Sequence, residues 1–368
     1  MKSGGETAVQ QASGGSNPAA RALPSEGRPE PDSFTRTEAN PDMQEALAQC
    51  GDSEGIPPPA DEELDLSAIE RTDRKPRTPA ELVEAIKKEN SDSKVAEIIE
   101  SEVDLIIKNN SAISNFSVVF LYDFTEINRS HASAIYQSLT KAEKKKDILL
   151  ILKSPGGEVE PAYLISKLCN RLKKEKFIVG IPAEAKSAAT LLSLGADEIH
   201  MGAMSELGPI DPQINGYPAL AFSSALEKIA QLADKYPGAS EMLAKYLLGS
   251  KLEIQALGHY DRITESSTQY AIRLLESKAT ATAAEDDDQA IEKLASYFTN
   301  HYKDHKFVID IEEAQKLLGS NVVFSETPIY QVCHEIHKTL ELCDFAMRVN
   351  KKNKRVVAMG DKFHLLSE

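Results

Sequence analysis

The apolar positions of the chain follow two patterns, one typical of buried strands and one of amphipathic helices. Apolar runs of strand length lie at 116–124, 147–152, 177–181 and 198–201. Segments with apolar residues at helical spacing lie between these runs, at 130–145, 161–174 and 188–194. The repeated order of strand, helix and strand predicts an α/β fold with right-handed crossovers and a largely parallel sheet.

Helical spacing also flanks this core on both sides. One or two amphipathic helices are predicted over 78–107, and longer helices over 220–248 and 252–277. We therefore assign residues 78–278 to one domain. A small, mostly helical C-terminal module is expected at 289–349, followed by a basic tail at 350–368. Residues 202–218 hold Pro, Gly, Asp and Asn at a density that predicts a loop.

The first 77 residues have a different composition from the rest of the chain. They are rich in Gly, Ser, Pro, Glu and Asp and contain few aromatic residues. Such a segment cannot bury enough apolar surface to offset the entropy lost on ordering. We expect residues 1–77 to form a disordered tail.

Charge and composition narrow the class of function. The chain has 368 residues and a net charge of −15, which argues against a nucleic-acid partner. Its four cysteines show neither the spacing of metal ligands nor a dense disulfide pattern. No apolar segment has the length of a membrane span or the form of a signal peptide. We expect a soluble, cytoplasmic protein without a metal or a cofactor.

Two histidine pairs have spacings that can hold a metal on a helix. His334 and His337 lie three apart, and His301 and His305 lie four apart. Neither pair has a third potential ligand nearby in sequence. We therefore interpret both as structural or exposed residues.

The first segment with chemical content is Ser154-Pro155-Gly156-Gly157, which follows the apolar run 147–152. Paired glycines after a buried strand can leave backbone N–H groups unobstructed and directed outward. Such groups make an oxyanion hole. Gly156 and Gly157 are therefore candidate donors.

The second segment is Ala185-Lys186-Ser187-Ala188-Ala189-Thr190, which follows the strand run 177–181. It places a serine among small residues at the start of a helix, where a substrate can approach closely. Two strand-to-helix connections in succession would bring this hydroxyl next to the glycine turn. We predict that Ser187 is a nucleophile and that the Ala188 N–H is a third oxyanion donor.

These segments, together with Gly195–Gly202 and Ser205–Gln213, resemble the serine dehydrogenase proteinase family of the ClpP/crotonase superfamily, in its signal peptide peptidase A branch. The resemblance covers about Thr78 to Ser325. It implies a superhelical core of repeated β-β-α units and a serine peptidase that hydrolyses peptide bonds. It also implies a homo-oligomer that encloses the active site.

The chain differs from ClpP in the residue expected to act as the general base. The position that holds a histidine in ClpP falls on Pro212, beside Asp211, and His200 and His259 lie at other distances from Ser187. The signal peptide peptidase A branch uses a lysine, which must be desolvated to accept a proton. The resemblance therefore implies a Ser-Lys dyad with Lys228 or Lys245, and the spacing favours Lys228.

The 202–218 loop is expected to lie against the active site. There Asp211 and Gln213 could orient the base or line the substrate groove. The alternative is that Asp211 and Pro212 serve only as turn residues.

Two other classes of function remain open. A crotonase-like acyl-CoA enzyme would use the same backbone donors with carboxylates such as Glu158 or Glu184, but no cradle for nucleotide phosphates is evident. A catalytically inactive scaffold would use Ser187 only as a small packing residue. A redox activity has no support, because no Gly-x-Gly-x-x-Gly segment opens a strand-helix unit.

Overall fold

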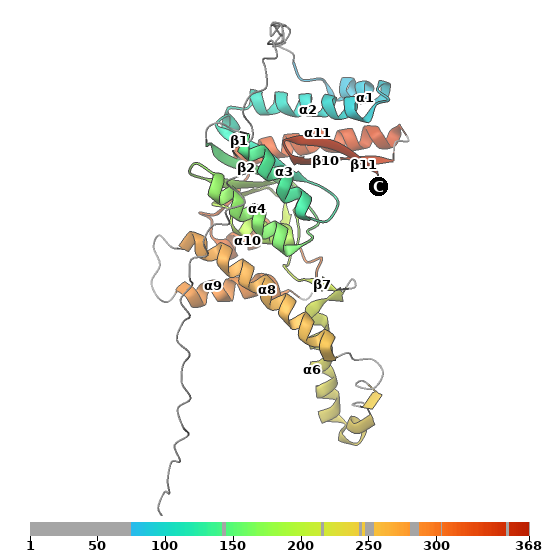
Figure 1. Ribbon diagram of the computed structural model, residues 1–368, viewed down its shortest axis with the longest axis vertical. Coiled ribbons are helices and arrows are strands. Elements are labelled where there is room, and N and C mark those ends of the chain that lie inside the picture. Colours follow the sequence, from blue (N-terminus) through green and yellow to red (C-terminus); the bar gives the residue numbers. More distant parts are fainter. Residues whose placement is uncertain are drawn as a thin grey trace, which may run out of the picture. The chain divides into compact units, whose positions relative to one another are not determined.

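The computed structural model describes residues 75–141, 145–214, 217–242, 245–246, 254–279, 287–302, 304–350 and 353–367. These residues belong to one compact unit, Thr72–Glu368. The tail predicted for residues 1–77 lies outside the described residues except for its last three. Figure 1 shows the arrangement of the described helices and strands.

A seven-stranded sheet in the order β11-β10-β1-β2-β3-β5-β9 forms the centre of this unit. Five neighbouring strands are parallel, and the C-terminal hairpin adds two antiparallel strands to the β1 edge. The strands are β1 (Phe116–Tyr122), β2 (Asp147–Lys153), β3 (Phe177–Ile181), β5 (Glu198–Met201), β9 (Val323–Ser325), β10 (Lys354–Gly360) and β11 (Lys362–Ser367). The predicted α/β class is confirmed.

The sheet is buried on both faces, which explains why its central strands are continuous apolar runs. Along β2, Leu150 and Leu152 belong to the core on one face, whereas Leu149 and Ile151 belong to the core on the other. All four side chains are fully buried. The strands β1, β2 and β3 each contribute side chains to both hydrophobic cores.

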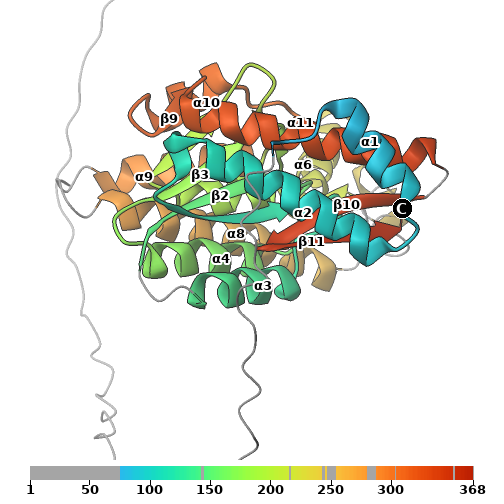
Figure 2. The same cartoon turned by 90° about the horizontal axis from the view of Figure 1, so that it is seen from above.

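Helices cover both faces, as Figure 2 shows with α3 and α4 on one side of the strands and α2 and α11 on the other. The helices of the first side connect consecutive strands: α3 (Arg129–Thr140), α4 (Val159–Leu172) and α5 (Ala188–Leu194). The other face is covered by α1 (Pro79–Lys88), α2 (Asp92–Asn109) and α11 (Pro328–Val349), which contribute to the second core. A short 3₁₀ turn, η3 (Ser111–Ile113), leads from α2 into β1.

A second, shorter ladder crosses the carboxyl ends of the parallel strands. It runs through the bridges Ile127–Gly157 and Ser154–Ala185, and then through β4 (Glu184–Ala185) paired with β6 (Glu206–Leu207). Each long strand is thus followed by a short extended segment before the chain continues. This arrangement contains the repeated β-β-α units that the resemblance implied.

The 202–218 segment is more ordered than a plain loop. Besides β6 it contains a small antiparallel pair, β7 (Gln213–Ile214) with β8 (Tyr217–Pro218). Leu207 forms an antiparallel bridge with Ile309, and the Ile210 N–H donates to the carbonyl of Phe298 (2.9 Å). Partners about one hundred residues away in the chain therefore fix a segment whose composition suggests irregular structure.

The C-terminal residues form part of the central sheet, and this corrects two expectations. The segment assigned to a basic tail holds the β10–β11 hairpin, which pairs with β1. The segment assigned to a separate module holds α10 (Ile311–Leu318), β9 and α11, and β9 pairs with β5. Gly360-Asp361 between two apolar runs is a local signal for a hairpin, but the partners of β9 and β10 in the sheet lie far away in the chain and have no local signal.

The remaining helices form a group beside α5. They are α6 (Ala219–Lys235), η4 (Pro237–Ala239), α8 (Ile254–Ala279), α9 (Asp287–Ser296) and a π-helical turn, η5 (Tyr297–His301). The buried residues Ala271 and Leu274 of α8 join the core formed by α4 and α5. In Figure 1, α6 extends away from the sheet.

Candidate active site

Two connections after neighbouring parallel strands meet next to Ser187. The Ser154 N–H donates to the carbonyl of Glu184, and the Lys186 N–H donates to the carbonyl of Ser154, both at 3.0 Å. This pairing places the glycine turn after β2 alongside the segment that leads into α5. The two segments predicted to form the site are therefore brought together.

Ser187 has an unusual backbone conformation. Its φ is 51° and its ψ is −117°, and it directly precedes the first residue of α5. A positive φ is uncommon for a residue with a Cβ and costs on the order of 1–3 kcal/mol. Its side chain does not cap the helix and makes no hydrogen bond to a described residue. This strained turn presents a half-buried hydroxyl with no partner in the described chain.

Gly156 and Gly157 lie where a side chain cannot fit. A Cβ on Gly156 would lie 2.7 Å from the Cβ of Ser187, and a Cβ on Gly157 would lie 2.2 Å from the N atom of Ile127. Both glycines also have positive φ, 107° and 143°. The backbone of the turn therefore approaches Ser187 as closely as only glycine permits.

The three predicted oxyanion donors differ in their hydrogen bonds. The N–H of Gly156 donates to the buried Oγ of Ser154 (3.2 Å), so Gly156 is not a free donor, contrary to the expectation. Within the described ranges, the N–H groups of Gly157 and Ala188 have no acceptor. Ala188 is the first residue of α5, where backbone N–H groups lack partners within the helix. Gly157 and Ala188 thus supply the two available donors.

The predicted lysines are not in a desolvated environment in this structure. Lys228 is exposed on α6. The side chain of Lys245 is 76% exposed and pairs with Glu241 at 2.8 Å. Lys186, next to the serine, is mostly buried, but its Nζ pairs with Glu206 at 3.0 Å. None of the three fits the neutral, buried amine that a Ser-Lys dyad requires.

Asp211 has a partner that sequence reasoning missed. Its carboxylate is hydrogen-bonded to Nδ1 of His305, and the exposed fractions of the two side chains are 3% and 27%. Asp211 accepts through Oδ1, so His305 donates from Nδ1, and Nε2 has no partner in the described chain. This is the orientation of a general base held by a carboxylate.

Asp211 follows the strand β6, which pairs with the segment that leads to Ser187. β6 is parallel to β4, with Leu207 opposite Ala185. The next residue, Gly208, packs on Lys186, because a Cβ at Gly208 would lie 3.4 Å from the Cα of Lys186.

The geometry agrees with a comparison of the sequence with known families. Residues 81–240 match the model of the ClpP-like SDH-type serine proteinases. The match covers 160 of the 368 residues, and over these residues the chain is similar to this family. "Uncharacterized protein MJ0137" of Methanocaldococcus jannaschii is similar as well, with 29% identity over 217 residues, which cover 59% of this chain and 67% of that protein.

Solved structures show weaker similarity. The 1510-N membrane-bound stomatin-specific protease, in a variant with a bound substrate peptide, has 19% identity and a TM-score of 0.34, over 57% of this chain and 76% of that one. ClpP1 from Listeria monocytogenes has 17% identity and a TM-score of 0.32, over 58% of this chain and 94% of that one.

The remaining predicted residues do not contact the candidate site residues described above. Gln213 is exposed on β7 and pairs with Pro218 through its backbone. His301 stacks on Tyr297, with ring centroids 4.0 Å apart, whereas His305 binds Asp211. His337 accepts from or donates to the hydroxyl of Tyr122 (2.7 Å) and lies on α11. His305 and His337 thus bind different partners, Asp211 and Tyr122, and neither spaced pair of histidines shares a ligand among the described residues.

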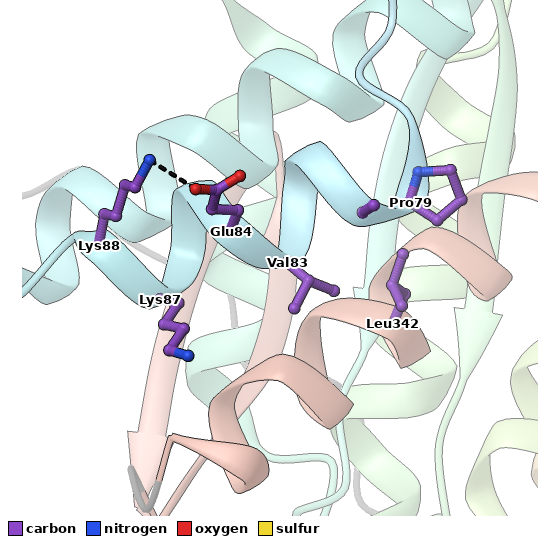
Figure 3. Close-up of a pocket in the computed structure, with 7 residues that line it drawn as sticks. Pro79, Val83, Glu84, Lys87, Lys88 and Leu342 are labelled. Carbon is purple, nitrogen blue, oxygen red and sulfur yellow. Dashed lines mark ion pairs between the residues drawn. The ribbon is translucent and has the colours of Figure 1, made fainter.

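Figure 3 shows a pocket whose lining does not include Ser187. It lies between α1 and α11, and its lining includes Val83 and Leu342 with the ion pair Glu84–Lys88 (2.7 Å). None of its lining residues is a candidate site residue. In the described part of the chain, no helix combines the length and the apolar character of a membrane span.

Proposed function

We propose that this chain is a serine peptidase in which Ser187 attacks the carbonyl carbon of a peptide bond. The observation that carries the proposal is the strained Ser187 beside two unoccupied N–H groups, those of Gly157 and Ala188. The developing oxyanion would accept hydrogen bonds from these groups. The amine leaves, and water hydrolyses the acyl-enzyme that remains.

For the base, we propose His305, held by Asp211. Nε2 of His305 would take the proton of the Ser187 hydroxyl and later give it to the leaving amine. The bond between Nδ1 and the buried Asp211 carboxylate supports this role because it fixes the tautomer and orients the ring. No hydrogen bond joins His305 to Ser187 in the described chain, so the proposal requires the two to close in the substrate complex.

The Ser-Lys dyad stays as the second proposal for the base, and it depends on assembly. Four apolar side chains are exposed on α6 and the residues that follow it: Leu232, Tyr236, Met242 and Tyr246. We propose a cytoplasmic homo-oligomer that acts on peptide or protein substrates, with contacts through this surface. Burial of this surface in an oligomer would desolvate Lys228 or Lys245 and lower the pKa of its amine, so that it could act as a base.

Labelling with a fluorophosphonate serine probe tests these proposals. We expect the wild type to label and Ser187→Ala to lose labelling completely. General-base catalysis contributes about 10²–10⁴-fold, so His305→Ala should label at least about 100-fold more slowly, whereas Lys228→Ala and Lys245→Ala should label like the wild type. Each variant is first shown to be folded and assembled.

Two results would change this assignment. Loss of labelling in a lysine variant, with His305→Ala unaffected, would favour the Ser-Lys dyad. A wild type that labels in no assembled state would contradict the peptidase and favour the inactive scaffold or the acyl-CoA enzyme.

A further inference from the structure

A buried ionisable pair, Asp123 and His131, lies next to the glycine turn and has no part in the proposed chemistry. Their side chains are 1% and 2% exposed, and Oδ2 of Asp123 lies 2.9 Å from Nε2 of His131. Asp123 follows the last residue of β1, and His131 is in the first turn of α3. Burying an ionisable pair is costly, so its local contacts indicate what it holds in place.

The pair fixes both ends of the short segment Thr125–Asn128. Oδ1 of Asp123 accepts from the Thr125 N–H at 2.8 Å. A carboxylate only accepts, so His131 donates from Nε2, and in the neutral ring Nδ1 accepts from the Asn128 N–H at 3.1 Å. The two ends of the segment are thus hydrogen-bonded to opposite sides of one buried pair.

Ile127, in the middle of this segment, is hydrogen-bonded to the glycine turn. The Ile127 N–H donates to the carbonyl of Gly156 (2.7 Å), and the Glu158 N–H donates to the carbonyl of Ile127 (2.8 Å). These two bonds flank Gly157 on both sides, and Gly157 packs directly on the Ile127 backbone. The direction of the Gly157 N–H therefore depends on the position of Ile127.

We propose that Asp123 and His131 are positioning residues that aim the Gly157 N–H at the substrate carbonyl through the segment Thr125–Asn128. This inference rests on the proposed peptidase function. An oxyanion donor accelerates a reaction only when it is already directed at the developing charge. A mobile Thr125–Asn128 segment would leave the donor in place on average but poorly directed.

Asp123→Asn tests the proposal with almost no change in shape. An amide at position 123 can accept from Thr125 or from His131, but its NH₂ group then faces the other donor. If His131 shifts its proton to Nδ1, it loses the bond from the Asn128 N–H. In that case Nδ1 can still donate to Oδ1 of Asn128, 3.2 Å away, but in every arrangement the segment loses one hydrogen bond from a backbone N–H.

We would measure the maximal rate of fluorophosphonate labelling and the probe concentration that gives half of it. For Asp123→Asn we expect the maximal rate to fall about 10- to 100-fold, part of the loss caused by removing an oxyanion donor, with the half-saturating concentration unchanged. His131→Gln keeps a donor toward Asp123 and should stay within about threefold of the wild type, whereas His131→Leu should lose as much as Asp123→Asn.

Asp344→Asn is the matched control. Asp344 is as buried as Asp123 and fixes the backbone through the Val356 N–H (2.7 Å), but it lies on α11, in the other layer. It should label at the wild-type rate. The positioning proposal is overturned if a folded Asp123→Asn or His131→Leu labels like the wild type. Absence of labelling in the wild type overturns the peptidase itself, so the two failures are distinct.

Discussion

The two halves of the candidate site are built in different ways. The donor half, from Ser154 to Glu158 with Ser187 and Ala188, is held by backbone hydrogen bonds between neighbouring connections of one parallel sheet. The base half consists of Asp211 and His305, two side chains from segments far apart in sequence that meet in one hydrogen bond. Backbone pairing runs through the first half itself. In the second half the nearest backbone pairing is the Leu207–Ile309 bridge, and the two functional side chains meet in a single contact.

The turn that carries His305 illustrates the weaker constraint. The Phe307 N–H donates to the carbonyl of Asp304 (3.0 Å), and the Lys306 N–H donates to the Asp304 carboxylate (3.0 Å). These bonds are local and leave the turn more exposed than the glycine turn. Changes in the donor half should therefore alter activity and stability together, whereas changes in the base half should alter activity alone.

The largest effect is expected for Gly157→Ala. The new Cβ would lie 2.2 Å from the Ile127 backbone, so either the turn or the Thr125–Asn128 segment must move. We expect labelling to fall by at least about 100-fold, as for loss of an oxyanion donor, and the free energy of unfolding to fall by about 1–3 kcal/mol.

Gly238→Ala is the control for this substitution, because no atom lies within 4 Å of its Cβ position. Its unfolding free energy should stay within about 0.5 kcal/mol of the wild type, with unchanged labelling. Normal labelling by Gly157→Ala would remove Gly157 from the oxyanion hole and undo the distinction between the halves.

A smaller effect, confined to activity, is expected for Asp211→Asn. The amide can still contact His305, but it no longer favours the imidazolium that forms when His305 accepts a proton. The maximal labelling rate should fall about 10- to 100-fold, while urea denaturation shows a change in unfolding free energy below about 1.5 kcal/mol.

Asp304→Asn, in the turn that carries His305, is the control for Asp211→Asn. The amide oxygen can still accept from the Lys306 N–H, so labelling should stay at the wild-type rate. Equal labelling by both variants would mean that Asp211 only stabilises its loop, which was the turn-residue alternative.

The same distinction explains how much the sequence could predict. The strands 177–181 and 198–201 and the helix 188–194 occur with the predicted bounds. They are encoded locally, by apolar runs and by the glycine and serine turns between them. The prediction that the glycine turn lies beside Ser187 rests on the same local signals.

The base half could not be predicted because its geometry depends on distant pairing. Leu207 bridges Ile309, and this contact brings the Asp211 and His305 segments together. No periodicity links positions so far apart. The place of the β10–β11 hairpin in the sheet could not be predicted for a similar reason, since it is set by pairing with β1 and not by the hairpin's own composition. A lysine was expected because no histidine follows Ser187 at the ClpP spacing.

The smallest expected effect is on the pH dependence of stability. It tests the Asp123–His131 pair, which we propose positions the donor half. Burial by itself raises the pKa of Asp123, but the hydrogen bonds from His131 and Thr125 outweigh it, and the pKa lies below its usual value. Such a group stabilises the fold above the usual pKa of about 3.9, and this stabilisation is lost as the pH falls through the lower, folded-state value. The stability advantage of the wild type over Asp123→Asn should therefore shrink on acidification.

Asp344 should behave in the opposite way, which makes the measurement a comparison within one fold. Burial dominates there and raises the pKa of Asp344, although the Val356 N–H and Arg355 oppose it. The folded state then binds the proton more tightly than the unfolded state, so acidification through this range adds stability in the wild type that Asp344→Asn lacks. Urea titrations between about pH 3 and 7 should give slopes of opposite sign for the two variants, relative to the wild type. Slopes of the same sign would mean that the hydrogen bonds of Asp123 do not hold its carboxylate ionised. The hydrogen bond from the Thr125 N–H to Asp123 would then not be charge-assisted.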